Sequence, residues 1–154
     1  MNAVKPLDTI PYIDKIGYYA RNNNLPTYVM QNLVHRVSDY TCEKVVRDSN
    51  IPYSISQEDT GINDVGQYFC WGLAQVPGSL FLQLKHLNFL ADSVIQLIYP
   101  GKNMEVACKI IRHFRNHNGS LELAIYKYLK SDIDLYDINE DDPVFKTVTE
   151  ILDK

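Results

Sequence analysis

The 154-residue sequence predicts one all-α domain spanning residues 1–154, a bundle of about six or seven helices around a central apolar helix at residues 80–99. Three observations support this prediction. Apolar residues recur at helical spacing over most of the chain. The segment 80–99 is apolar over an arc of about 160° on a helical wheel, wide enough to need several neighbouring helices. No internal repeat, low-complexity tract or linker divides the sequence.

The composition is that of a globular protein, because 45% of the residues are apolar and 22% are charged. The formal net charge of -4 argues against a general nucleic-acid binder, which needs clustered Lys and Arg to neutralise phosphates. Residues 1–20 contain no apolar stretch typical of a secretory signal. Cys42, Cys70 and Cys108 lie far apart among apolar neighbours and are expected to be reduced, buried thiols. A cytoplasmic protein is therefore predicted.

Two helices are expected in the first third of the chain. Thr9-Ile10-Pro11 has the pattern of an N-cap followed by proline in the first turn, and this helix should end near Asn22. The second helix is predicted from Tyr28 to about Arg47. Its apolar stripe consists of Met30, Leu33, Val34, Val37, Thr41 and Val45. Residues 49–63 are predicted to be the longest loop, and a short helix should begin near Asp64 and end before Pro77-Gly78.

The central helix at 80–99 is expected to have Ser79 as its N-cap. Its predicted apolar arc consists of Leu80, Leu84, Leu87, Leu90, Ala91, Val94, Ile95, Leu97 and Ile98. Charged residues within the segment make it a poor membrane span, so no membrane insertion is predicted. Leu82 and Phe89 fall on its otherwise polar side, whereas Gln83 falls within the apolar arc.

Pro100-Gly101 is expected to end the central helix, after which Asn103 would cap a helix from Met104 to about Arg115. Ser120 opens the segment 121–129, which fits a helix better than a strand, although its Leu121, Leu123 and Ile125 also alternate. Residues 132–142 are predicted to be an acidic loop. Asp142-Pro143 should start the last helix.

No pattern of residues predicts catalysis, a cofactor or a metal site. His113 and His117 are four residues apart, the spacing that places two imidazoles on one helix face, but no third ligand follows at a recognisable interval. The sequence lacks a glycine-rich phosphate loop and a nucleophile elbow. The sequence favours a non-enzymatic protein. The absence of a motif does not decide whether the protein is an enzyme.

Two surfaces are predicted to contact a partner. Leu82 and Phe89 would form an exposed apolar pair unless a loop covers them. The only basic cluster consists of Lys102, Lys109, Arg112, His113, Arg115 and His117. The acidic segment 132–142 could fold back and partly neutralise that cluster. The residues expected to bind a partner are Leu82, Phe89, Lys109, Arg112, His113 and Arg115.

These surfaces favour a small helical protein that binds another macromolecule, above all a protein, as an inhibitor, adaptor, immunity factor or effector of a microbe or its virus. A homodimer is also compatible with them. One alternative is an enzyme or ligand-binding protein with a site between helices, built from His35, Gln83, His86 and Cys108. Another is nucleic-acid binding through residues 102–117, with Arg36, Lys44 and Arg47 joining the same face.

Overall fold

The computed structural model describes residues 12–52 and 64–154. Over these residues the fold is mostly helical, with six α-helices and a three-stranded antiparallel sheet in the order β1-β2-β3. The predominantly helical class is therefore confirmed, but the all-α assignment is wrong, because short extended segments pair into the sheet. Within the described residues, no helix combines the length and apolar character that crossing a membrane requires.

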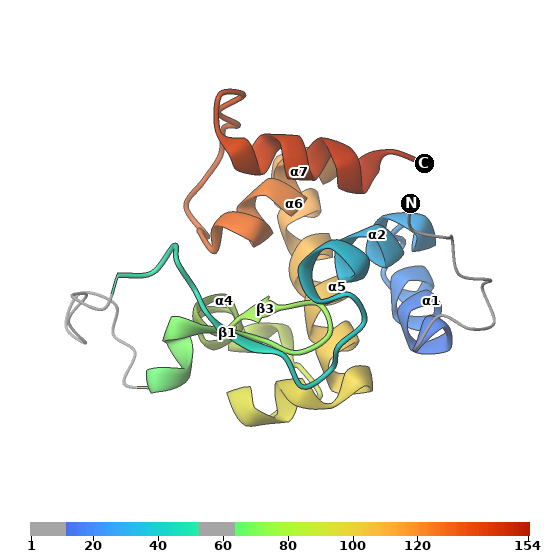
Figure 1. Cartoon of the computed structure of the whole chain (residues 1–154), viewed down its shortest axis with the longest axis vertical. Helices are drawn as coiled ribbons and strands as arrows, with labels where there is room; N and C mark the ends of the chain where they lie inside the picture. Colours follow the sequence, from blue (N-terminus) through green and yellow to red (C-terminus); the bar gives the residue numbers. More distant parts are fainter. Residues whose placement is uncertain (1–11, 53–63) are drawn as a thin grey trace.

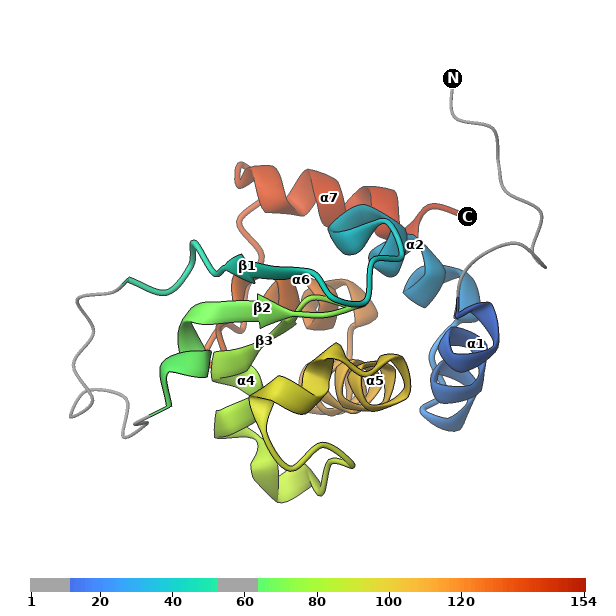
Figure 2. The same ribbon diagram turned by 60° about the horizontal axis from the view of Figure 1, so that its bottom comes forward.

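Helix α5 lies in the middle of the molecule and packs against α1, α4 and α6. In Figure 1, α1 and α2 lie to its right, the sheet and α4 lie to its left, and α6 and α7 lie above. Figure 2 shows the three strands side by side, with α7 above β1 in that view. The α-helices are α1 (Ile13–Asn22), α2 (Thr27–Ser38), α4 (Gly78–Gln83), α5 (Pro100–Asn118), α6 (Leu121–Lys130) and α7 (Pro143–Leu152). The other elements are β1 (Val45–Arg47), β2 (Phe69–Trp71), β3 (Val76–Pro77) and the 3-10 helices η2 (Val65–Tyr68), η3 (Lys85–Leu87) and η4 (Val94–Ile98).

The prediction of a central helix at residues 80–99 is wrong. Helix α4 ends at Gln83, and only the short 3-10 helices η3 and η4 follow before α5 begins. Asn88 lies in the left-handed region with φ 61°, and Ser93 is extended. Asn, Asp and Ser compete with the helical backbone for hydrogen bonds, so Asn88 and Asp92-Ser93 interrupt the helix despite its apolar wheel.

Helix α5 takes the central place instead. Pro100, predicted to end a helix, is the first residue of this one, as expected for a residue without an N–H group. The predicted helix from Met104 to Arg115 is confirmed and is longer at both ends. Its C-cap is Gly119, with φ 72°. The buried residues of α5 are Asn103, Met104, Glu105, Val106, Ala107, Cys108, Ile110, Ile111 and Phe114.

The helix predicted from Tyr28 to Arg47 ends early, at Ser38. Asp39 and Tyr40 both have positive φ, which stops the helix, and residues 45–47 form β1. The prediction failed because the apolar residues of 37–47 also suit a strand, and pairing of Val46 with Cys70 in β2 selects that conformation. The end of α1 at Asn22 is confirmed, whereas Thr9 and residues 53–63 of the predicted loop lie outside the described residues.

The predicted caps have mixed outcomes. Asp64 caps η2 by accepting a hydrogen bond from the Gly66 N–H, but only four helical residues follow before β2. Ser79 does not cap a helix; it lies inside α4, and its buried hydroxyl has no hydrogen-bond partner among the described residues. The helix at 121–130 and its Ser120 cap are confirmed, as is the start of α7 at Asp142-Pro143.

Asn103 was expected to be a helix cap, but it lies within α5, where its fully buried side chain joins three backbone segments. Its Oδ1 accepts a hydrogen bond from the Ala74 N–H at 2.7 Å, and its Nδ2 donates to the carbonyl oxygens of Trp71 at 2.8 Å and Leu97 at 2.7 Å. Gly72 lies against this amide with φ 72°. A Cβ atom there would overlap the Leu97 carbonyl oxygen and the Asn103 amide nitrogen, so glycine is required.

We expect Asn103→Ala to lower the free energy of unfolding by roughly 3 kcal/mol, because three buried backbone groups would lose their partner. Urea denaturation followed by circular dichroism measures the change. Asn116→Ala, an exposed position on the same helix, is the matched control and should change stability little. Equal losses in the two variants would contradict the assigned role of the Asn103 amide.

Candidate functional site

The predicted apolar pair, Leu82 and Phe89, is half-buried and packs against the core. The Phe89 ring stacks on the ring of Phe81 with 5.4 Å between centroids. Gln83, which the wheel placed inside the protein, is exposed. These differences arise because residues 80–99 do not form one helix, whereas the directions of their side chains were predicted from a continuous helical period.

Two of the predicted partner-binding cations hold the protein's own backbone. Lys109 forms a 2.7 Å ion pair with Glu105 and donates a hydrogen bond to the Asn88 carbonyl oxygen at 2.9 Å. Arg115 donates to the carbonyl oxygen of Asn24 at 2.6 Å, just beyond the end of α1. Both side chains therefore fix segments around α5, which is a structural role. Arg112 and His113 are half-buried on the same helix.

Four large apolar side chains on segments beside the first turns of α5 are more than half exposed. Leu90 is 55% exposed, Ile95 64%, Tyr99 56% and, on α1, Tyr18 55%. We call these four residues the Tyr99 surface. Ile95 lies on η4, which leads directly into α5, and Tyr99 is the N-cap residue of α5.

Contacts with α5 locate the other members of the Tyr99 surface. The Leu90 N–H donates to Glu105 Oε1 at 3.0 Å, and Lys102 Nζ lies 5.8 Å from the Tyr99 ring centroid. Residues 102 and 105 are neighbours on one helix face. The ring of Tyr18 contacts that of Tyr19 edge-on at 5.0 Å.

Tyr19 and Lys15 of α1 both lie beside Gly101. A Cβ atom built on Gly101 would be 3.9 Å from the Tyr19 hydroxyl and 3.9 Å from Lys15 Cδ. Lys15 and Lys102 thus bring positive charge to the margin of the Tyr99 surface. The nearby carboxylate of Glu105 is already engaged by Lys109 and by the Leu90 N–H.

A second group of side chains brings together His86 of η3 with His113 and His117 of α5. The ring centroids of His113 and His117 are 4.4 Å apart, and those of His86 and His113 are 6.0 Å apart. Burial lowers the pKa of His113 from its ordinary value of 6.5, and His117, His86 and Lys127 lower it further. Within residues 12–52 and 64–154, no three His, Cys, Asp or Glu side chains are placed to hold a metal ion.

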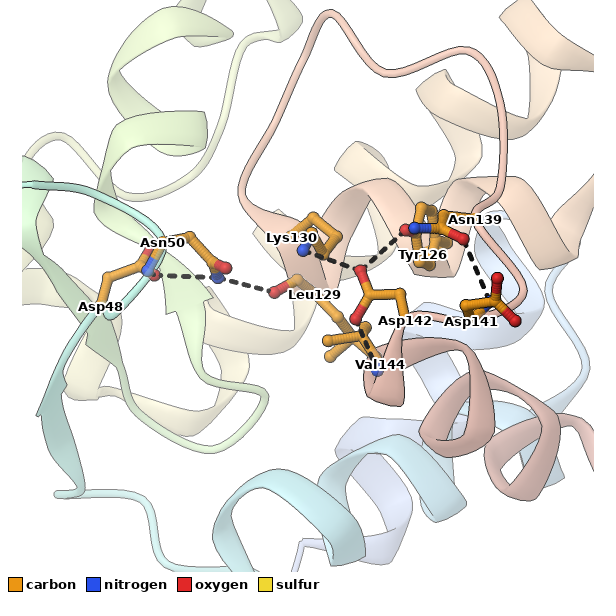
Figure 3. Close-up of polar contacts among 9 residues, drawn as sticks. All are labelled: Asp48, Asn50, Tyr126, Leu129, Lys130, Asn139, Asp141, Asp142 and Val144. Carbon is orange, nitrogen blue, oxygen red and sulfur yellow. Dashed lines mark hydrogen bonds and ion pairs between the residues drawn. The ribbon is translucent and has the colours of Figure 1, made fainter.

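A hollow of about 270 Å³ lies between the sheet, the end of α2 and α6. Several of its polar groups form hydrogen bonds within the protein. Asp48, which is 2% exposed, accepts a hydrogen bond from Ser131 Oγ at 2.6 Å. It also accepts one from Asn50, whose Nδ2 donates to the Leu129 carbonyl oxygen as well (Figure 3). The residues that line the hollow are Val37, Lys44, Val46, Arg47, Asp48, Ser49, Asn50, Cys70, Gln75, Pro77, Tyr128 and Leu129.

Cys70 and Cys108 lack the features of a nucleophile. Burial raises the pKa of the Cys70 thiol far above its ordinary value, and the neighbouring carboxylate of Asp48 raises it further. Burial has the same effect on the pKa of Cys108, which the sequence suggested as a member of an alternative site between helices. Both thiols are therefore protonated at neutral pH and poorly suited to attack a substrate.

The acidic segment 132–142 forms an ion pair with Lys130 of α6, and among the described residues it forms none with the basic cluster on α5. Asp142 accepts a hydrogen bond from Tyr126 Oη and forms an ion pair with Lys130, both at 2.8 Å, and also caps α7 through the Val144 N–H (Figure 3). Lys130, the Val144 N–H and Tyr126 lower the pKa of Asp142 to about 2. This carboxylate joins α6 to α7.

The residues of the two alternative sites are not joined. No hydrogen bond, ion pair or ring contact links any two of His35, Gln83, His86 and Cys108 in the part of the chain that the structure describes. Of the extra cations needed for nucleic-acid binding, Arg36 pairs with Glu150 at 3.0 Å and Lys44 Nζ donates to the Val37 carbonyl oxygen. In comparisons with known proteins, no family model matches the chain and no curated protein matches it.

Sequence reasoning missed Leu90, Ile95 and Tyr99 as surface residues. The helical wheel assigned Leu90 and Ile95 to the core. The signal that could have identified them is the set of turn-forming residues in the same segment, Asn88 and Asp92-Ser93, which break the period between the apolar positions. The approach of His86 to His113 has no sequence signal, because it depends on how η3 packs on α5.

We expect Asp142→Ala to lower the free energy of unfolding by about 1–2 kcal/mol at pH 7, through loss of the α7 cap and of the contacts with Lys130 and Tyr126. Because the folded pKa is below the ordinary value of 3.8, the carboxylate contributes its full stabilisation above pH 3.8 and loses it as the pH falls through 2. The difference between Asp142→Ala and the unchanged protein should thus shrink at pH 2. Urea denaturation at both pH values measures it, with exposed Asp141→Ala as control.

We expect His113→Gln to weaken the pH dependence of stability between pH 7.5 and 5.5. A folded pKa below 6.5 means that the unfolded chain binds more protons at this position, so the unchanged protein loses stability as the pH falls. The free energy of unfolding of the variant should fall less steeply. His35→Gln, at an exposed histidine on α2, provides the comparison. Identical slopes for the two variants would show that His113 is not responsible.

Proposed function

We propose that the chain acts by binding a protein partner through the Tyr99 surface. The observation that carries this proposal is that Tyr18, Leu90, Ile95 and Tyr99, on segments beside the first turns of the central helix, are each more than half exposed. Single exposed apolar residues are common on any protein, whereas several on neighbouring segments are typical of a binding surface. Tyrosine is also among the residues that contribute most to binding energy.

The charges at the margin of the surface favour an acidic partner. Lys15 and Lys102 lie beside Gly101 and Tyr99, although the protein as a whole has a net charge of -4. A partner with apolar or aromatic anchors and a margin of carboxylates would complement this arrangement. In a microbe or its virus, an inhibitor, adaptor, immunity factor or effector would use such a surface.

The proposed surface differs from the one expected from sequence, although both involve the segment between α4 and α5. Leu82 and Phe89 pack against the core, and Lys109 and Arg115 hold backbone carbonyls. Phe89 and Lys109 would therefore hold the segment that carries Leu90. The direct contacts are proposed for exposed residues whose substitution should not unfold the protein.

A photo-crosslinking amino acid placed at position 95 or 99 tests the proposal in extracts of the native source. We expect one discrete adduct from each of these two positions, because both would lie within the interface. Tyr136, which is 82% exposed on the acidic loop, is the matched control position and should give none. An adduct with twice the mass of the chain would indicate self-association and would contradict a foreign partner.

For the partner so identified, we expect Ile95→Asp and Tyr99→Asp each to weaken binding by roughly tenfold or more, since a charge would replace an apolar anchor. Both side chains are exposed, so the melting temperature should change little. Lys102→Glu should weaken binding more at low salt than at high salt. If the two Asp variants bind like the unchanged protein, the Tyr99 surface is not the interface.

A further inference from the structure

Four basic side chains meet where η3, α5 and α6 come together. His113 of α5 is central: its ring centroid is 4.4 Å from that of His117 and 6.0 Å from that of His86. Lys127 of α6 also acts on His113. The groups that shift the protonation of His113 are all cationic when protonated, and no carboxylate is among them. The carboxylates that act on the cluster are those of Asp132 and Asp134, which act on Lys127 without forming an ion pair with it.

Lys127 is the unusual member of this cluster. The residue is only 6% exposed, and its Nζ lies 4.4 Å from the ring centroid of Phe114. In the described residues it forms no ion pair or side-chain hydrogen bond. Asp132 and Asp134 act on it electrostatically from outside ion-pair distance. Lysines this deeply buried are almost always paired, whereas the Nζ of Lys127 has no ion-pair partner among the described residues and is not among their fully buried polar atoms, so that an anion can approach it from solvent.

We propose that His86, His113, His117 and Lys127 form a binding site for a phosphate-like oxyanion. The imidazole N–H groups and the ammonium come from three elements and can donate to several oxygens at once, which suits the multiple acceptors of a phosphoryl group. Other charged residues of the packed elements are Lys85 beside His86, Arg112 on α5, and Lys109, whose partner is Glu105. Asp132 and Asp134 are the carboxylates that act on the cluster, through Lys127.

Binding at this site is coupled to protonation. His117, His86 and Lys127 repel the protonated form of His113, and burial disfavours it further. An oxyanion would offset these effects and favour protonated imidazoles, so the protein takes up protons as the anion binds. Affinity therefore rises as the pH falls from 8 towards 6, the range in which histidine titrates.

The site is separate from the Tyr99 surface. Gly101 and His113 are twelve residues apart on α5, which corresponds to roughly 18 Å along the helix. The oxyanion site and the protein-binding proposal can therefore be tested independently, and the failure of one leaves the other unchanged.

Titration of the full chain with inorganic phosphate, followed by the imidazole proton signals in NMR spectra, tests this proposal. We expect saturable shifts at His86, His113 and His117 but not at His35, and a dissociation constant lower at pH 6 than at pH 8 by roughly threefold or more. His113→Gln and Lys127→Met should each weaken binding by roughly tenfold. His35→Gln and Lys146→Met, at exposed positions elsewhere, should not change it.

Three outcomes would overturn the proposal: equal shifts produced by chloride at matched ionic strength, unchanged affinity in a folded His113→Gln protein, or stoichiometric zinc binding with no response to phosphate. If Lys127→Met fails to fold, His117→Gln, at an exposed position, provides the same test. Parallel titrations with O-phosphoserine and a nucleoside monophosphate then distinguish the sources of the phosphoryl group. Tighter binding of one of them identifies the compound class to which the site is adapted.

Discussion

The side-chain amide of Asn103 joins the central helix to the turn between β2 and β3, and much of the fold depends on this link. The backbone of that turn is buried, and buried N–H and C=O groups must find partners. Asn103 serves the N–H of Ala74, while Tyr128 donates to the Ala74 carbonyl oxygen and Ser38 to that of Leu73. Helices α5, α6 and α2 thus all attach to one turn, and the Ala74 N–H and the carbonyl oxygens of Leu73 and Ala74 have partners.

The sequence predicted best where structure is decided locally. The starts of α6 and α7 follow from Ser120 and Asp142-Pro143, residues whose preference for helix starts arises from their own side chains and backbone. The helical spacing of the buried residues in α5 and α6 was likewise sufficient. In these segments local preference and tertiary packing favour the same conformation.

Prediction failed where distant contacts decide. Residues 45–47 form a strand because β2, more than twenty residues later, pairs with them. Residues 84–99 have the composition of a core helix, yet α5 fills the centre and leaves Leu90 and Ile95 at the surface. The candidate sites also depend on contacts between distant segments. The Tyr99 surface and the cluster around His113 combine residues from separate elements, and no periodic pattern encodes such proximity.

The contact between Gly72 and Asn103 has an evolutionary consequence. A side chain at position 72 would occupy the space of the Asn103 amide, and a different residue at 103 would leave the carbonyl oxygens of Trp71 and Leu97 without their donor. Single substitutions at either position are therefore disfavoured even though neither residue belongs to a proposed binding surface. In any set of relatives both residues should be conserved together, so that this pair identifies the fold when the rest of the sequence has diverged.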